Sequence, residues 1–334
     1  MSFKEIIGHD KQIEHLQNAM RNGRIAHAYL FAGKEGIGKE LVALNLAKGL
    51  NCLRGSEDPC DECRSCSKVG HLNHPDVLLV KPRGQSIRID QVRDLQRELS
   101  HRPYEGKRRV CILADSDRMT QEAANALLKT LEEPPLHTVM ILLAANPDLI
   151  LPTIASRCQR IPFHPLSVEQ LTEVVRARLA LEGNEAHILA SLADGSPGKA
   201  FQMDPDVILR TRGEIIKKVI DLPLYGGERI LGLAEELTTS SHDLAMVLTM
   251  IHAWYRDLLA YRETGTGAQL INIDLSHEIQ KAASATTTPS LIHRMEVVQE
   301  ALWNLERNAN RQITMEALLL DLARTKGLHG DVWS

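Results

Sequence analysis

Aromatic side chains and long apolar runs are both scarce in this sequence of 334 residues. Aromatic residues make up 4% of the chain, so the hydrophobic cores must consist mainly of aliphatic side chains. This scarcity argues against a single-strand nucleic-acid binder, which needs aromatic surfaces on which bases stack. No run of about 18 apolar residues occurs, which argues against a membrane-spanning helix. The charged first ten residues do not resemble a signal peptide, and we therefore expect a cytoplasmic protein.

An excess of positive charge is also missing. The formal net charge is −4, whereas proteins that coat duplex DNA are usually basic. Any contact with nucleic acid is therefore expected to be local or to depend on partner proteins. The length predicts two or three domains, at roughly 100–200 residues per domain.

Short apolar runs alternate with helical patterns in the first half of the chain. Strands are expected at His27–Ala32, Val77–Val80, Val110–Leu113 and Val139–Ala144. Helices are expected between them at residues 10–20, 39–50, 90–99 and 121–131. This alternation predicts an α/β domain, in which a parallel sheet carries helices on both faces.

The strand signal ends near Phe163, and helical patterns fill the rest of the chain. Residues 166–181 and 187–193 predict two helices of a small lid, and nearly continuous helix follows from Asp204 onward. We therefore predict an α/β fold with additional all-α parts, arranged in three domains. Their expected ranges are 1–163 for the α/β domain, 164–204 for the lid and 205–334 for a larger helical domain.

Residues 33–40 (GKEGIGKE) follow an expected strand and open an expected helix, which is the context of a phosphate-binding loop. The residues expected to contact phosphate oxygens are Gly33, Gly36, Gly38 and Lys39. The next residue is Glu40, at a position where a Ser or Thr hydroxyl would ligate Mg²⁺. We predict an inherited site for ATP or ADP, with the binding of Mg²⁺ left open. A glycine-rich turn that binds no nucleotide is the alternative.

The acidic part of the expected nucleotide site is also unusual. In an ATPase with such a loop, an aspartate at the end of a neighbouring strand binds the metal ion. The corresponding position here, directly after Leu113, is Ala114. Asp115 lies one position later and is the candidate acidic residue of the nucleotide site, and Asp117 lies two residues beyond it. The alternative is that both aspartates cap the following helix or face solvent.

Four of the six cysteines lie within fifteen residues. The spacing Cys52-x7-Cys60-x2-Cys63-x2-Cys66 lets four thiolates surround one Zn²⁺ tetrahedrally. Such a site has no open coordination position, so we predict a structural metal that folds the polar residues between the cysteines. Free thiols and an iron–sulfur cluster are the alternatives. Cys111 lies in an expected strand and is predicted to be a small buried residue.

Three further stretches identify a family. Residues 125–135 read NALLKTLEEPP, residues 151–158 read LPTIASRC, and residues 74–76 read HPD. Together with the phosphate-binding loop and the cysteine insert, they resemble the AAA+ subunits of bacterial clamp loaders, most closely the stator type. These motifs fall within residues 3–200, and the C-terminal third agrees in length and helical character.

The resemblance implies an assembly with several partners. Such subunits form a heteropentamer with gamma/tau motor subunits, which bind ATP, and with a delta subunit. The heteropentamer opens the ring-shaped sliding clamp and closes it on primer–template DNA, as part of a DNA polymerase holoenzyme. The C-terminal helical domain would form the collar that joins the subunits.

The resemblance also assigns a role to Arg157 in the Ser-Arg-Cys stretch. In the family this arginine projects into the ATP site of a neighbouring motor subunit. A permanently charged guanidinium can stabilise the charge of phosphoryl transfer when a second chain supplies it. The alternative is an arginine that forms a salt bridge with its own domain.

Two sensor positions of the family can be located as well. Asn146 matches the polar sensor that contacts the γ-phosphate, although asparagine is also common in a turn before proline. The arginine of the second sensor falls on Gly198 in residues 195–199 (GSPGK). With Glu40 and Ala114, Gly198 makes three departures, and each removes a different part of metal or phosphate handling. We therefore predict little or no ATP hydrolysis by the chain alone.

Two other functions remain open at this point. A working ATPase of the gamma/tau type would share Gly38, Lys39 and the cysteine insert, but not the three departures. A zinc-containing nucleic-acid-binding module is the other reading, and the negative net charge and few aromatic residues weigh against it.

Overall fold

The computed structural model describes residues 2–55, 57–181, 183–222, 226–239, 243–267 and 270–324. The chain divides into two compact units. The N-terminal unit comprises Met1–Val174 and Gly195–Lys199, and the C-terminal unit comprises Val175–Asp194 and Ala200–Ser334. The finer division into three domains stays a prediction.

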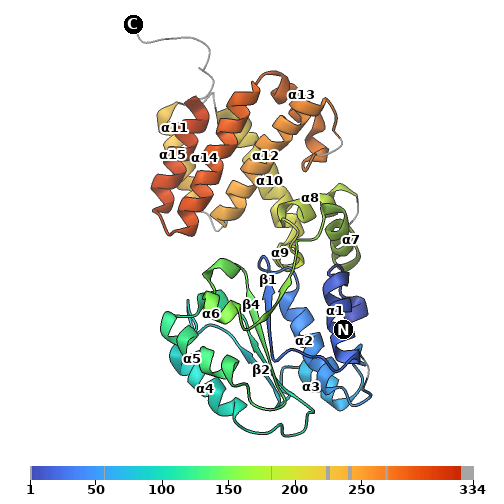
Figure 1. Ribbon diagram of the computed structural model, residues 1–334. Helices are drawn as coiled ribbons and strands as arrows, with labels where there is room; N and C mark the ends of the chain where they lie inside the picture. Colours follow the sequence, from blue (N-terminus) through green and yellow to red (C-terminus); the bar gives the residue numbers. More distant parts are fainter. Residues whose placement is uncertain are drawn as a thin grey trace. The chain divides into compact units, whose positions relative to one another are not determined.

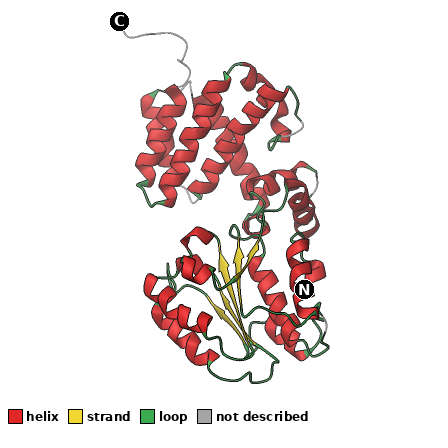
Figure 2. Ribbon diagram, viewed as in Figure 1, coloured by secondary structure: helices red, strands yellow, loops and turns green. Residues whose placement is uncertain are grey.

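A five-stranded parallel sheet forms the centre of the N-terminal unit (Figures 1 and 2). Its strands are β1 (Ala28–Ala32), β2 (Val77–Val80), β3 (Arg109–Leu113), β4 (Thr138–Ala144) and β5 (Gln159–Pro162). They lie in the order β2-β3-β4-β1-β5, and every neighbouring pair is parallel. The predicted α/β class is confirmed, and all four predicted strands are present to within one residue at each end.

Helices cover both faces of this sheet. One face packs against α1 (Asp10–Arg21) and α2 (Lys39–Asn51), with the short α3 (Arg64–Gly70) beside α2. The other face packs against α4 (Ile89–Leu99), α5 (Gln121–Glu132) and α6 (Pro152–Ala155). Side chains of a strand point alternately to the two faces, so Phe31 belongs to the first core and Leu30 to the second. Cys111 is fully buried, as predicted.

Two elements of this unit have no clear signal in the sequence. β5 is an edge strand in which only Ile161 is buried, so it lacks the apolar run that marks the central strands. α3 spans seven residues between and beyond the last two cysteines, and its polar composition suggested turns. Short 3-10 helices occur at Phe3–Glu5, Ser116–Arg118 and Pro147–Leu149.

The C-terminal unit consists of helices, as predicted, and no strand occurs after Pro162 in the described ranges. Its longer helices are α8 (Asn184–Leu192), α10 (Pro205–Asp221), α11 (Gly227–Thr239), α12 (Leu244–Thr264), α13 (Ser276–Ser284), α14 (Thr288–Glu306) and α15 (Arg311–Arg324). α7 (Val168–Leu179) and α9 (Pro197–Gln202) contribute residues to both units. The core of this unit surrounds Trp254.

A buried aspartate organises the loop before α13. Asp257 accepts hydrogen bonds from the backbone N–H groups of Ile271 (2.9 Å) and Asn272 (2.7 Å). Asn272 in turn accepts a bond from the guanidinium of Arg212 (2.7 Å), which is itself buried. Buried charges are tolerated when hydrogen bonds satisfy them, so this network ties α10 and α12 to the loop.

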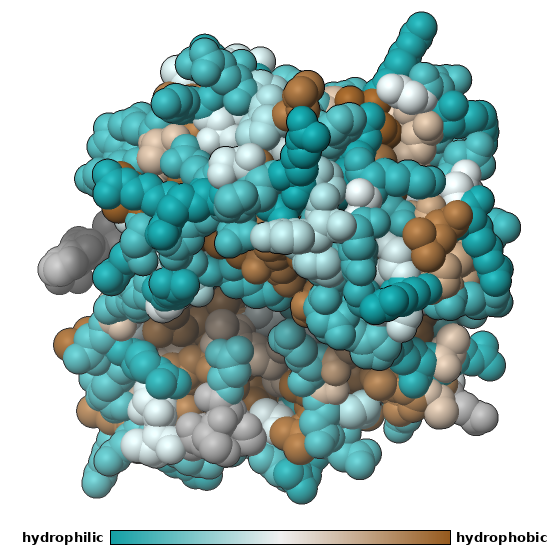
Figure 3. Space-filling view, turned by 90° about the horizontal axis from the view of Figure 1, so that it is seen from below, coloured by the Kyte–Doolittle hydropathy of each residue, from teal (hydrophilic) through white to brown (hydrophobic). Residues whose placement is uncertain are grey.

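The molecular surface is mostly hydrophilic on the face drawn in Figure 3, where hydrophobic residues form small separate patches. Among the helices of the described ranges, none is long and apolar enough to cross a membrane.

Candidate functional site

The carboxyl edge of the sheet brings the predicted nucleotide-site residues together. The phosphate-binding loop follows β1, Asp115 follows β3, and Asn146 follows β4. Because these strands are parallel, their carboxyl ends meet at one edge, which is where open α/β sheets bind ligands. The structure therefore places these residues at one edge of the sheet, and their role in binding a nucleotide stays a prediction.

The loop has the backbone geometry that phosphate binding needs. Gly36 and Gly38 have φ angles of +73° and +106°, a region that favours glycine. A Cβ atom on Gly33 would lie 2.3 Å from the carbonyl oxygen of Phe163, so only glycine fits there. α2 starts at Lys39, and its N-terminus directs backbone N–H groups and partial positive charge toward the loop.

Lys39 is buried and bonded to the loop itself. Its ammonium group donates to the carbonyl oxygens of Gly33 and Lys34. Burial lowers the pKa of Lys39, and the carboxylates of Asp117 and Asp115 act in the opposite direction. In this arrangement the lysine stabilises the loop and is compensated by two aspartates of the same chain.

The next three carbonyl groups of the loop also accept bonds from outside it. Ser196 Oγ donates to the carbonyl oxygen of Glu35 (3.0 Å), and the N–H of Gly198 donates to that of Gly36 (2.9 Å). His9 Nε2 lies 2.7 Å from the carbonyl oxygen of Ile37 and is placed to donate to it. Every carbonyl group from residue 33 to 37 thus has a partner, so the loop is firmly held.

Gly198 packs directly against the backbone of the loop. A Cβ atom on Gly198 would lie 2.9 Å from both the Cα atom and the carbonyl oxygen of Gly36. Neither backbone atom can move away without moving the loop. The position that the family resemblance assigns to a sensor arginine therefore has room only for glycine in this structure.

The other polar residues at this edge have partners within the chain. Glu40 forms an ion pair with Lys81 (2.9 Å). Asp117 Oδ2 accepts from the backbone N–H of Asn146 (2.8 Å), while its Oδ1 is buried without a hydrogen-bond partner among the described residues. The side chain of Asn146 caps the 3-10 helix that begins at Pro147, accepting from the N–H of Asp148 (3.1 Å).

Arg157 lies in the turn two residues after α6, and its side chain is 37% exposed. Its guanidinium forms an ion pair with Glu132 of the same chain (2.8 Å) and donates to the carbonyl oxygen of Thr153 (2.9 Å). Both readings of this residue, a local ion pair and a group available to a second chain, are compatible with this geometry.

The four clustered cysteines lie at the opposite end of α2. All four Sγ atoms lie within 4.8 Å of one another, with 3.6 Å between Cys52 and Cys60 and 4.0 Å between Cys60 and Cys66. Zn–S bonds of about 2.3 Å in a tetrahedron require sulfur–sulfur distances of about 3.8 Å. Cys63 is the fourth member of the cluster. The cluster therefore has the dimensions of the four-thiolate metal site that the sequence predicts.

The His-Pro-Asp stretch attaches this cluster to the sheet. His74 is buried and lies 3.1 Å from Ser65 Oγ of α3. Asp76 is fully buried and accepts from the backbone N–H groups of residues 104, 105 and 106 at 2.7, 2.9 and 2.7 Å. The buried guanidinium of Arg109 lies 3.5 Å from Asp76. Sequence reasoning recognised this stretch only as a family motif and did not reveal its structural role.

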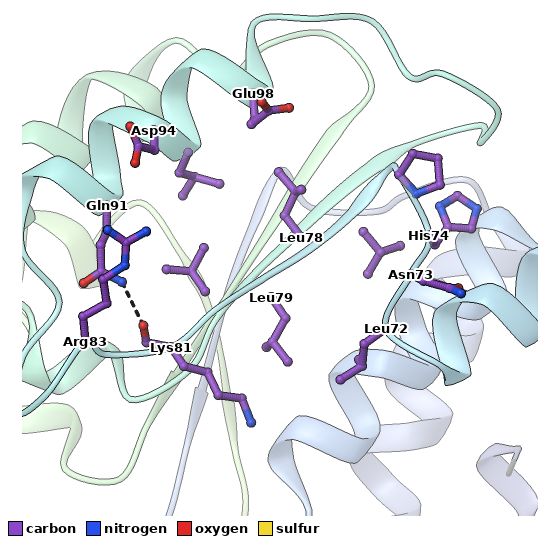
Figure 4. A pocket seen from close by; sticks show the side chains of 14 residues that line it. Leu72, Asn73, His74, Leu78, Leu79, Lys81, Arg83, Gln91, Asp94 and Glu98 are labelled. Atoms are coloured by element: carbon purple, nitrogen blue, oxygen red, sulfur yellow. Dashed lines mark hydrogen bonds between the residues drawn. The ribbon is translucent and has the colours of Figure 1, made fainter.

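A groove of about 590 Å³ lies along the free edge of β2 (Figure 4). Leu78 and Leu79 of β2 line it from opposite faces of the strand, and α4 provides polar side chains that include Gln91. Gln91 Nε2 donates to the carbonyl oxygen of Lys81 (2.8 Å), as a neighbouring strand would. A short edge strand that is followed by a lysine and a proline, as β2 is by Lys81 and Pro82, is a typical protected sheet edge.

Comparisons with known proteins point in one direction. Residues 8–167 match the family model described as DNA polymerase III, delta subunit, and residues 220–324 match the model of its C-terminal part. The chain is 35% identical to DNA polymerase III subunit delta' of Bacillus subtilis, over 92% of this chain and 94% of that protein. It is 32% identical to subunit delta' of Pseudomonas aeruginosa, over 90% and 93% of the two chains. It is also 28% identical to subunit tau of Escherichia coli, over 97% of this chain but 48% of tau.

Proposed function

The chain belongs to the family of DNA polymerase III delta-prime subunits, and on this premise we propose that it is the stator of a bacterial clamp loader. In this role it assembles with gamma/tau motor subunits and a delta subunit into a heteropentamer. The assembly loads the sliding clamp onto primer–template DNA. The C-terminal helices form the collar of the ring, and residues 164–204 act as the lid of the α/β domain.

The state of the phosphate-binding loop carries the proposal that this subunit hydrolyses little or no ATP. Lys39 is engaged by carbonyl groups of the loop, Gly198 lies against Gly36, and Glu40 faces Lys81. Catalysis of phosphoryl transfer depends on a lysine and a metal ion held against the phosphates. The loop keeps the backbone donors of a phosphate site, but it offers no hydroxyl for a metal ion after the lysine. The site therefore fits a retained nucleotide pocket better than a hydrolytic one.

The chemical contribution of the chain is then made by Arg157 in the ATP site of a neighbouring motor subunit. Its exposure and its position in the turn after a short surface helix support this role. The guanidinium would stabilise negative charge as phosphoryl transfer proceeds in the neighbouring chain. The four cysteines bind one structural Zn²⁺, which holds the insert between α2 and α3.

A motor subunit of the gamma/tau type is the second candidate. Nearly the whole length of this chain aligns with about half of tau, and the chain retains Lys39. The two candidates differ in one measurement, ATP turnover by the chain alone and in the assembled loader. We expect turnover by the isolated chain at background level and unchanged in Lys39→Ala. Turnover at the rate of motor subunits, abolished by Lys39→Ala, would establish the motor candidate.

The assembled loader tests the role of Arg157. Arg157→Ala should leave folding and assembly intact and reduce DNA-stimulated turnover substantially, because a trans arginine contributes about 10³-fold or more at the site it serves. Other motor sites continue to turn over, so single-turnover hydrolysis at the adjacent site is the sharper measurement. Unchanged hydrolysis there would remove the proposed role.

A further inference from the structure

The guanidinium of Arg157 is held from two sides in the free subunit. Glu132, the last residue of α5, lies 2.8 Å from one terminal nitrogen, Nη2. The carbonyl oxygen of Thr153 in α6 lies 2.9 Å from the other terminal nitrogen, Nη1. The two acceptors belong to two different helices of the N-terminal unit, which pack against each other.

We propose that Glu132 is a positioning residue, which orients Arg157 for the neighbouring motor subunit's nucleotide. The inference rests on the proposed trans role of Arg157. A carboxylate on one terminal nitrogen and a carbonyl on the other fix the plane of the group. Arginine carries five N–H donors, so these two bonds leave further donors for phosphate oxygens. The side chain meets its target already ordered, which lowers the entropy lost on docking.

Glu132 could in principle act in the opposite sense, by competing with the phosphates for the guanidinium. The geometry favours positioning, because the ion pair is exposed on both sides, at 37% and 52%. Exposed ion pairs are weak, so the carboxylate is a poor competitor for the guanidinium, and it can stay on Nη2 while the remaining N–H donors contact phosphate oxygens. Fixing the orientation of a long side chain, in contrast, affects the reacting geometry directly.

The experiment uses the assembled loader with single substitutions in this subunit. Glu132→Ala should lower kcat for hydrolysis at the adjacent motor site by about 3- to 10-fold, less than the roughly 10²-fold of a group misplaced by 1 Å, because an exposed ion pair restrains the arginine only weakly. The KM for ATP should remain within about twofold of wild type, since a positioning residue acts on kcat. Glu132→Gln keeps an acceptor oxygen without the charge and should restore most of the rate. A rate increase in Glu132→Ala or Glu132→Gln would overturn positioning and indicate competition.

Glu133 provides a matched control, because it is the adjacent exposed carboxylate at the end of α5. Glu133→Ala should have no effect on hydrolysis, and an effect equal to that of Glu132→Ala would overturn the inference. Thermal unfolding and gel filtration of each variant show whether folding and assembly are intact. In the double variant Glu132→Ala/Arg157→Ala, the rate should equal that of Arg157→Ala alone.

The outcomes separate this inference from the proposed function. If Arg157→Ala lowers hydrolysis and Glu132→Ala does not, the trans role stands and the positioning role fails. If Arg157→Ala has no effect, the proposed trans role itself fails. Additive losses in the double variant would show that Glu132 acts independently of Arg157, which also overturns positioning.

Discussion

The two ends of the parallel sheet are held by different chemistry. At the carboxyl edge, hydrogen bonds to the carbonyl groups of the phosphate-binding loop hold the loop in place. The donors include the hydroxyl of Ser196 and the backbone N–H of Gly198. The amino edge is held by a cluster of four cysteines and by two fully buried charged residues, Asp76 and Arg109, in the segments that lead into the strands. The carboxyl edge therefore depends on close packing at glycines, and the amino edge depends on buried charge and on the cluster of four cysteines.

The two edges therefore differ in the groups that hold them. At the carboxyl edge the loop has the backbone geometry that phosphate binding needs, and internal hydrogen bonds engage its lysine and its carbonyl groups. At the amino edge the charged groups of Asp76 and Arg109 are fully buried, and three backbone N–H groups bind the Asp76 carboxylate. Substitutions at the amino edge should consequently cost more stability, and a substitution at the carboxyl edge should act more locally, on the phosphate-binding loop.

Removing a ligand of the cysteine cluster should have the largest effect. Cys63→Ser should abolish stoichiometric zinc and lower the melting temperature by about 15 °C, because metal binding supplies the folding free energy of such inserts. Elemental analysis and thermal unfolding, with and without a chelator, measure this. Cys158→Ala is the control, because that thiol lies outside the cluster. A wild-type preparation without metal and without response to chelator would contradict the prediction.

Substitution of Asp76 should have the next largest effect. Asp76→Asn leaves the amide group facing N–H donors and leaves Arg109 without its counter-charge. We expect a loss of about 3–4 kcal/mol, as for a broken buried ion pair. Chemical denaturation at neutral pH measures this loss. A loss below about 1 kcal/mol would show that the amino edge does not depend on this charge.

The pH dependence of stability sharpens the same test. Burial alone would raise the pKa of Asp76, but three backbone N–H groups and Arg109 outweigh it and lower the pKa. A lowered pKa in the folded state stabilises the protein above the unfolded-state pKa of about 3.9. This contribution is lost as the pH falls through the folded-state pKa. Asp76→Asn should therefore flatten the acid limb of the stability curve.

The sequence predicted the features that depend on local pattern. The central strands are apolar runs, the helices have amphipathic spacing, and the cysteines have the spacing of metal ligands. Each of these patterns lies within one segment, so the sequence predicts each feature. β5 was missed because Gln159 and Arg160 are exposed and only Ile161 carries an apolar signal. Pattern-based reasoning works where one segment alone contains the information.

The remaining features join residues that are distant in the sequence. The bonds from His9 and Gly198 to the loop have separations of 28 and 162 positions, and no local motif announces them. The pairing of Glu132 with Arg157 is of the same kind. The sequence could indicate that Gly198 departs from the sensor arginine, but only the folded chain shows what occupies that space instead.

Among these substitutions, Gly198→Ala should have the smallest effect on stability, and its effect should be confined to the phosphate-binding loop. The added Cβ atom would lie 2.9 Å from backbone atoms of Gly36, so the segment or the loop must shift. Overpacking of this kind costs about 1–3 kcal/mol. The loop should also lose protection, which hydrogen–deuterium exchange of residues 33–38 would detect.

Gly213 is the matched control for this substitution, because it lies inside α10 and a Cβ atom there meets nothing within 4 Å. Gly213→Ala should stabilise the protein by about 0.5–1 kcal/mol through helix propensity alone. The sign of the effect therefore differs between two chemically identical substitutions. If Gly198→Ala stabilised the protein as Gly213→Ala does, the contact between residues 198 and 36 would not hold the loop. The carboxyl edge would then be an open nucleotide site, and its contrast with the amino edge would disappear.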